Sequence, residues 1–111
     1  MIGSGDRGGW SDRQLLAAIG ERDGAACAVF YRRHFPLVLR YLMRETRDRE
    51  AAADLAAEVF AAVLLAAGRY RPQTETAVPW LVGIARNTLG ASRRRCRAGH
   101  RAGRGLARRR T

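Results

Sequence analysis

Apolar residues recur at steps of three and four in several segments of the chain, and this spacing constrains the fold more than any other feature of the sequence. The longest such stripe lies between Asp23 and Thr46. Its members are Ala26, Val29, Phe30, Leu37, Val38, Tyr41 and Leu42. A stripe with this period is typical of a helix that buries one face. No run of β-branched residues alternates with polar ones, so we expect an all-α protein.

Residues that start and stop helices divide the chain into four helical segments. Side chains able to cap a helix N-terminus precede the first three segments: Ser11, Asp23 and Asp48. The corresponding helices should end near Gly20, Thr46 and Gly68. Pro79 suits the first turn of a fourth helix, which we expect to run to about Arg97 after a polar connector at residues 69–77. The pattern predicts a compact four-helix bundle over residues 11–97.

The two ends of the chain differ in composition from this middle part. Residues 1–10 are rich in glycine, which predicts a flexible leader. Residues 98–111 contain only Arg, Gly, Ala, Leu, His and Thr, which predicts a disordered basic tail that no core could use.

The positive charge is confined to the C-terminal part of the chain. All 21 basic residues are Arg, and the formal net charge is +11. Residues 1–68 hold nine Arg and nine acids, whereas residues 69–111 hold twelve Arg and the single acid Glu75. This asymmetry predicts contact with a polyanion, against the alternative of a basic tail that only aids solubility. We favour nucleic acid over an anionic membrane, because only Leu106 in the tail resembles the bulky apolar residues of interfacial helices.

Other classes of protein find little support in the sequence. Asp54 and Glu58 interrupt the longest apolar run and the N-terminus lacks a signal-peptide pattern, so we expect a cytoplasmic protein without membrane insertion. Cys96 and His100 are four residues apart, but a zinc site needs two further ligands, and none is nearby. The sequence offers no nucleophile with a plausible base, no credible carboxylate pair and no phosphate loop. We therefore expect neither an enzyme nor a metal or cofactor.

Three segments, in order and at family spacing, resemble the extracytoplasmic-function (ECF) group of the sigma-70 family of bacterial RNA polymerase sigma factors. Phe30–Leu42 is similar to the second helix of region 2 in that family, and Asp48–Val63 to the helix that docks on the polymerase. Pro79–Leu89, followed by Arg93–Arg95, resembles the promoter-reading helix. The resemblance covers about residues 12–97 and implies the N-terminal domain that binds core polymerase and reads the −10 element.

The resemblance implies polymerase contact, with the coiled coil of the largest subunit, by four residues of the third helix: Asp54, Leu55, Glu58 and Phe60. The two acids are four residues apart, so they share one helix face amid apolar neighbours. On the residues alone, a solvated acidic stripe with Phe60 in the core is the favoured interpretation. The family often has Gln where this chain has Ala57, a departure that removes a polar contact with the polymerase.

The resemblance also implies contact with the non-template strand of promoter DNA. The residues so predicted are Arg69, Arg71, Trp80, Arg86, Asn87, Arg93, Arg94, Arg95 and Arg97. Guanidinium groups along one side of a helix neutralise phosphates and release counterions. Trp80 and Asn87 would stack on and hydrogen-bond a flipped base, although Trp80 is equally compatible with a core anchor. His34 is better explained by a hydrogen bond than by chemistry. An anti-sigma factor is a further partner that the resemblance allows.

A complete ECF sigma factor carries a second, region-4 helix-turn-helix domain, which we expect to be absent from this chain. Three explanations stay open: a natural single-domain sigma factor, a regulator that occupies polymerase without directing it, and a non-functional remnant. A different class of function is a non-sequence-specific helical module that binds nucleic acid without a polymerase partner. That module would bind DNA in a strongly salt-dependent way and be indifferent to core polymerase.

Overall fold

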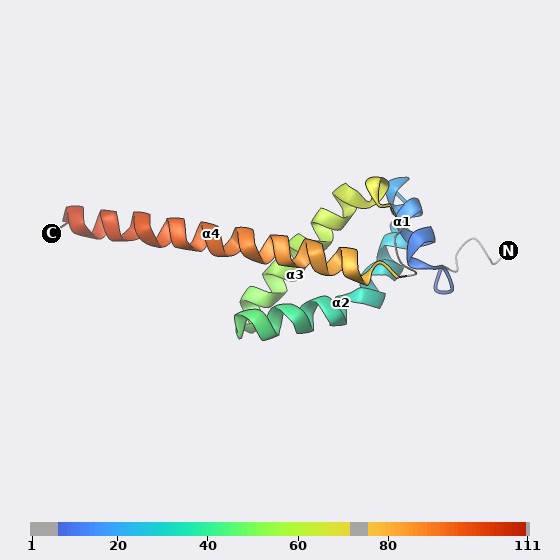
Figure 1. Cartoon of the computed structure of the whole chain (residues 1–111), viewed down its shortest axis with the longest axis horizontal. Helices are drawn as coiled ribbons and strands as arrows, with labels where there is room; N and C mark the ends of the chain where they lie inside the picture. Colours follow the sequence, from blue (N-terminus) through green and yellow to red (C-terminus); the bar gives the residue numbers. More distant parts are fainter. Residues whose placement is uncertain (1–6, 72–75, 111) are drawn as a thin grey trace.

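Within the residues that the structure describes, four α-helices and one short 3₁₀ helix follow one another (Figure 1). The helices are α1 (Asp12–Gly20), α2 (Gly24–Thr46), α3 (Arg49–Ala66), η2 (Ala67–Arg69) and α4 (Val78–Arg110). The computed structural model describes residues 7–71 and 76–110, with side chains up to residue 99, and those ranges contain no strand. The predicted all-α fold is confirmed.

The first three helices begin where the capping residues predict. Ser11 and Gln14 form a capping box, in which the Gln14 N–H donates to Ser11 Oγ (3.2 Å) and the Ser11 N–H donates to Gln14 Oε1 (2.8 Å). The carboxylate of Asp23 accepts from the Ala26 N–H, and that of Asp48 accepts from the first turn of α3. These side chains satisfy amide donors that have no partner within their own helix.

The core lies between α2 and α3, and α1 and the first half of α4 close it from two sides. Its largest fully buried side chains come from all four helices: Leu15, Leu16, Phe30, Val38, Leu42, Val59, Val63 and Leu81. Each of these side chains contributes about 1.5–3 kcal/mol by leaving water. The periodic stripes of the sequence are therefore the faces that meet in the core.

α1 approaches η2 so closely that one contact requires glycine. A Cβ atom on Gly20 would lie 2.9 Å from the Cα atom of Gly68, closer than real Cβ contacts allow. Gly68 itself lies inside η2, because α3 passes directly into a 3₁₀ turn rather than ending at a glycine cap. The α-helix ends at Ala66, close to the end that Gly68 predicts, and Gly68 also forms a tight contact with α1.

α4 is longer than the sequence pattern predicts. Its last buried residue is Leu89 and the side chains of residues 93–99 are exposed, yet the backbone continues as helix past Arg97 to Arg110. The boundary expected near Arg97 is therefore not a helix end. Arg, Ala and Leu all favour helix, and no proline follows Pro79 to stop it. At about 1.5 Å per residue the helix is roughly 50 Å long, and Figure 1 shows it crossing α3 and projecting beyond the bundle.

The end of the predicted leader packs against the bundle rather than remaining separate from it. Arg7 Nε lies 2.8 Å from Asp23 Oδ2, and the Arg7 guanidinium lies 5.2 Å from the ring centre of Trp10. Trp10 in turn packs against the core. The expectation of a flexible leader over residues 1–10 is thus wrong for residues 7–10, because an ion pair and an aromatic ring hold them. Residues 1–6 lie outside the described residues.

One helical stretch, Arg49–Arg69, is long and apolar enough by length and composition to cross a membrane. In this fold it is the helix that supplies much of the core. Its buried residues are Ala52, Leu55, Ala56, Val59, Phe60, Val63 and Ala67. Core helices of soluble proteins pass the same test, so the stretch is weak support for a membrane span.

Candidate functional site

The outer face of α3 changes from acidic to apolar along its length. Glu50, Asp54 and Glu58 are exposed and lie four residues apart, so they share one face. The same face continues through Ala61 to Leu65, whose side chain is 81% exposed. We call Glu50, Asp54, Glu58, Ala61 and Leu65 the α3 outer face. The α3 outer face thus combines a row of carboxylates with one large exposed apolar side chain.

Two of the four residues predicted to bind polymerase are on this face, and two are in the core. Asp54 and Glu58 are exposed, whereas Leu55 is only 5% exposed and Phe60 9%. Leu55 and Phe60 support the helix from inside. Leu65 was not identified in the sequence analysis. Its spacing of four residues from Ala61 and seven from Glu58 could have placed it on the same helix face as the acids.

A shallow apolar pocket of about 490 Å³ adjoins the α3 outer face, between α2 and α3. Phe60 lies at the centre of its aromatic lining, with its ring centre 4.9 Å from that of Tyr31. Tyr31 and Phe35 stack at 4.9 Å along α2. Ala57 lies in the lining as well.

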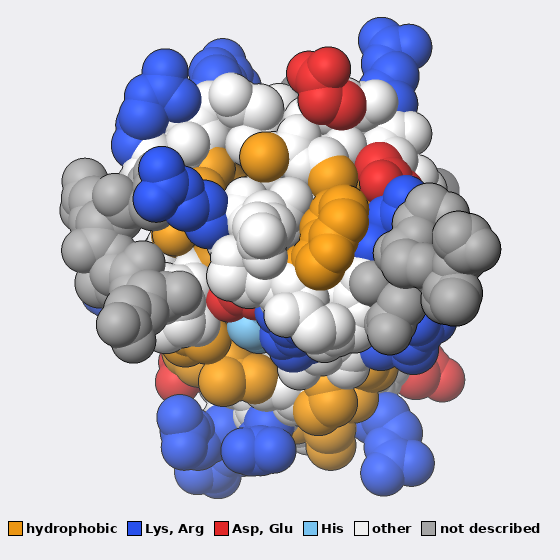
Figure 2. Space-filling view, turned by 90° about the vertical axis from the view of Figure 1, so that its right-hand side faces the viewer, with side chains coloured by type: hydrophobic (Ala, Val, Ile, Leu, Met, Phe, Trp, Pro, Cys, Tyr) orange, Lys and Arg blue, Asp and Glu red, His pale blue; other side chains and the backbone are white. Residues whose placement is uncertain are grey.

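The exposed side of α4 is basic between residues 86 and 97. Arg86, Asn87 and the cluster Arg93, Arg94, Arg95 and Arg97 are all exposed. Arg86, Arg93 and Arg97 follow one another by seven and four residues, so they line one side of the helix. Arg69 and Arg71 are exposed too, but they lie at the start of the connector that precedes α4. The end of the molecule away from this cluster is mixed in character, with arginines and some acids around apolar side chains (Figure 2).

Trp80 lies in the first turn of α4, half-buried against the core. Its ring meets that of Tyr70 edge to face, with 4.9 Å between the ring centres. Edge-to-face pairs of this kind restrict how both rings can turn. This position is compatible with both roles predicted for Trp80, since the residue packs on the core and is only half-buried.

The two predicted surfaces meet at their edges. Arg95 Nη2 lies 3.3 Å from Glu58 Oε1, which joins the basic side of α4 to the α3 outer face. Arg93 donates to the backbone carbonyl of Glu45 at 3.1 Å, and its guanidinium lies 3.8 Å from the Glu45 carboxylate. All four side chains are exposed, so these contacts are open to competition from a partner.

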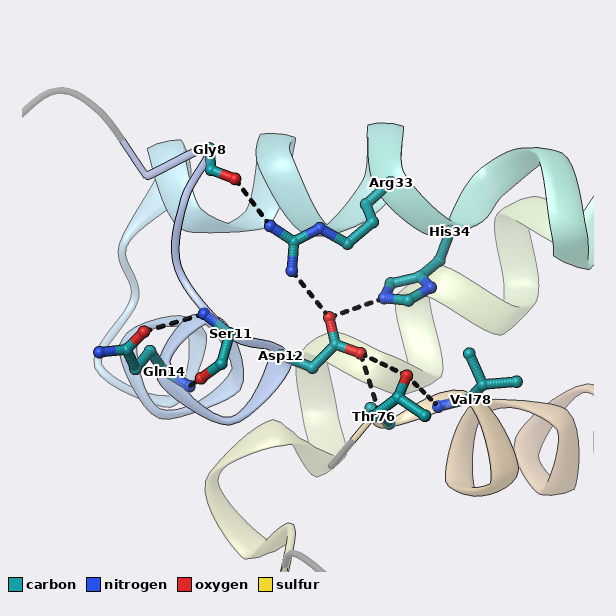
Figure 3. A network of polar contacts seen from close by, with 9 residues as sticks. Gly8, Ser11, Asp12, Gln14, Arg33, His34, Thr76 and Val78 are labelled. Carbon is teal, nitrogen blue, oxygen red and sulfur yellow. Dashed lines mark hydrogen bonds and ion pairs between the residues drawn. The ribbon is translucent and has the colours of Figure 1, made fainter. Parts of the chain in front are cut away.

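The buried carboxylate of Asp12, in α1, lies next to the start of α4. It was not identified in the sequence analysis. Asp12 accepts hydrogen bonds from Arg33, His34, Thr76 and the Ala77 N–H (Figure 3). Burial alone would raise the pKa of Asp12, but the hydrogen bond from Ala77, followed by those from His34 and Arg33, outweighs burial and lowers the pKa to about 2. The prediction that His34 serves a hydrogen bond is confirmed, since its Nε2 lies 2.8 Å from Asp12 Oδ1.

Among the residues with described side chains, no group of three or more His, Cys, Asp and Glu residues could hold a metal ion. Cys96 is exposed, and the side chain of His100 lies outside the described part of the chain.

Comparison with known proteins assigns the bundle to a family. The family model of sigma-70 region 2 matches residues 30–99, which is more than half of the chain and includes α3 and the first two thirds of α4. Searches of curated proteins and of solved structures gave no match. The acidic and basic faces described above both lie within the matched residues, whereas Asp12 precedes them. This chain therefore belongs to the sigma-70 region 2 family.

Proposed function

We propose that the protein is a sigma factor of the extracytoplasmic-function type, which holds core RNA polymerase with α3 and the melted −10 element with α4. Sigma-70 region 2 domains in general bind core RNA polymerase and recognise the −10 promoter element in transcription initiation. The observation that carries the finer proposal is the pair of adjacent surfaces on one core: the α3 outer face and the basic, Trp80-led side of α4.

For polymerase, the proposed contact is the α3 outer face against the coiled coil of the largest subunit. Asp54 and Glu58 would attract basic groups of the partner, which favours fast and correctly oriented association. Leu65 would supply the apolar part of the contact, where water is excluded. Leu55 and Phe60 would act from the core, by holding α3 straight beneath this face.

For DNA, the proposed contact runs along α4 from Trp80 toward Arg97. The exposed guanidinium groups would bind phosphates of the non-template strand, with a strong dependence on salt. The exposed part of Trp80 would stack on a base taken out of the duplex, and Asn87 would hydrogen-bond a base edge. Arg69 and Arg71 would add charge where the connector begins.

The proposal makes this chain a cytoplasmic binding protein that has no enzymatic activity and needs no cofactor. An anti-sigma factor is a further partner under this proposal.

The first test is binding of the fluorescently labelled chain to purified bacterial core RNA polymerase, followed by anisotropy. We expect saturable binding that Glu58→Arg weakens at least about tenfold, since the variant places like charges in contact. Glu21→Arg is the matched control, because Glu21 is an exposed acid at the end of α1, is not part of the α3 outer face, and should leave the affinity unchanged.

Two other outcomes would contradict the proposal. Salt-sensitive DNA binding without any affinity for core polymerase would favour the plain nucleic-acid-binding module. The absence of binding to both polymerase and DNA would favour a non-functional sigma remnant.

A further inference from the structure

A single buried carboxylate joins three helices at the point where α4 begins (Figure 3). Asp12, the first residue of α1, is 5% exposed. Its Oδ1 accepts from Arg33 Nη1 at 3.0 Å and from His34 Nε2 at 2.8 Å, both on α2. Its Oδ2 accepts from Thr76 Oγ1 at 3.0 Å and from the Ala77 N–H at 2.9 Å, directly before α4. Oδ1 thus binds side chains of α2, whereas Oδ2 binds the two residues directly before α4.

The two residues that Oδ2 binds are those from which α4 starts. The Ala77 carbonyl accepts the Leu81 N–H at 2.8 Å, which is the first hydrogen bond of the helix. Thr76 Oγ1 also accepts from the Val78 N–H at 3.3 Å. A negative charge at a helix N-terminus is favourable, because the first amide groups point their positive ends toward it. Asp12 therefore caps α4 from another helix.

The carboxylate adds an orientation that apolar packing does not supply. Leu81, Ala85 and Leu89 already hold α4 on the core, but apolar burial is largely indifferent to small rotations of a helix. Hydrogen bonds weaken steeply when their angles change. With two of them at its start, α4 can rotate or slide only if these bonds break.

We propose that Asp12 is a positioning residue for base recognition, acting through Thr76 and Ala77 to hold the first turn of α4 in one orientation. Trp80 lies in that turn, three residues after Ala77, with its ring against Tyr70. The position of the exposed edge of Trp80 therefore follows from the anchored start of the helix. This inference rests on the proposed function, in which Trp80 stacks on a base of the non-template strand.

The test changes the anchor without removing the buried charge. Thr76→Val deletes the hydroxyl that donates to Asp12, and Thr76→Ser retains it. Thr88→Val is the matched control, because within the described part of the chain the Thr88 hydroxyl bonds only to its own helix, at the Ile84 carbonyl. Asp12→Asn is the more severe variant, and Thr76→Val keeps the inference testable if that variant does not fold.

Two measurements separate positioning from general stability. In the first, the chain bound to core polymerase selects from forked DNAs whose single strand is randomised. Its affinity for the enriched sequence is then compared with its affinity for a scrambled version of that sequence. The second is hydrogen exchange of the Ala77 and Leu81 amides, measured on the free chain.

We expect Thr76→Val to reduce the preference for the enriched over the scrambled strand by about fivefold or more, the loss typical of a misplaced base contact. Its affinity for core polymerase should stay within about twofold of the parent, because α3 is untouched. Exchange at Ala77 and Leu81 should accelerate. Thr76→Ser and Thr88→Val should resemble the parent in strand preference, in affinity for core polymerase and in amide exchange.

An unchanged preference in Thr76→Val, or an equal loss in Thr88→Val, would overturn the inference. A parent complex with no sequence preference at all would instead contradict the proposed function and, with it, the recognition role. Unchanged exchange at Ala77 and Leu81 in both Thr76→Val and Asp12→Asn would show that the anchor itself is wrong.

Discussion

Glu58 of α3 and Arg95 of α4 form an ion pair, with 3.3 Å between Glu58 Oε1 and Arg95 Nη2. One partner belongs to the α3 outer face, and the other to the basic side of α4. Their side chains are 49% and 62% exposed, and ion pairs this exposed contribute only about 0.2–1 kcal/mol. A partner that binds either side chain therefore breaks the ion pair at little cost in free energy. The other side chain then becomes available for binding.

This pair predicts that loss of Glu58 strengthens DNA binding while it weakens polymerase binding. Glu58→Gln should raise affinity for single-stranded DNA by up to about fivefold at low salt, because Arg95 is released and a nearby negative charge is removed. Asp54→Asn is the matched control on the same face, since Asp54 forms no ion pair among the described residues. Anisotropy titrations with DNA and with core polymerase measure both effects. Equal gains in DNA affinity for the two variants would argue against the Glu58–Arg95 contact.

The exposed arginines of α4 predict a specific change in salt dependence. Arg97→Gln should lower DNA affinity and reduce the slope of log K against log salt concentration by about 0.7–0.9, the contribution of one phosphate contact. Arg32→Gln, at an exposed position of α2, should leave the slope unchanged. Titrations at four salt concentrations give both slopes. Equal effects of the two changes would indicate diffuse attraction rather than a contact along α4.

The contact between Gly20 and Gly68 predicts opposite effects of the same substitution at two glycines. Gly20→Ala should destabilise the protein by about 1–3 kcal/mol, because its methyl group would overlap the backbone at Gly68. Gly83→Ala should stabilise it by about 0.5–1 kcal/mol, since Gly83 lies inside α4 and a Cβ there meets no atom within 4 Å. Urea unfolding followed by circular dichroism measures both changes. A loss of stability in Gly83→Ala would contradict this reading of α4.

The lowered pKa of Asp12 predicts acid-sensitive stability. A carboxyl with a folded-state pKa of about 2, against 3.8 for the free group, stabilises the fold above pH 4 and loses that contribution as the pH falls toward 2. Asp12→Asn should therefore be less stable at pH 7, by roughly 2 kcal/mol, and should lose less on acidification than the parent. Urea unfolding at pH 7, 4 and 2.5 tests this. Asp54→Asn, at an exposed acid, should follow the parent curve, and a similar curve for Asp12→Asn would contradict the prediction.

The sequence by itself determined the helices and their N-termini. Ser11, Asp23 and Asp48 cap helices through contacts within three residues, and the apolar stripes repeat within a few turns. Such features depend on local chain geometry, so they are readable without the fold. The match of residues 30–99 to sigma-70 region 2 follows from the same segments that carry the resemblance in the sequence.

Only the tertiary structure decided which predicted residues face a partner. Asp54, Leu55, Glu58 and Phe60 lie within two turns of one helix, and the position of α2 and α4 against α3 leaves the two acids outside and buries the other two. The Asp12 anchor was equally out of reach of the sequence, because its donors Thr76 and Ala77 lie 64 and 65 residues away along the chain. Local patterns determine where helices form, whereas contacts between distant residues arise only when the apolar faces have packed and brought their polar neighbours together.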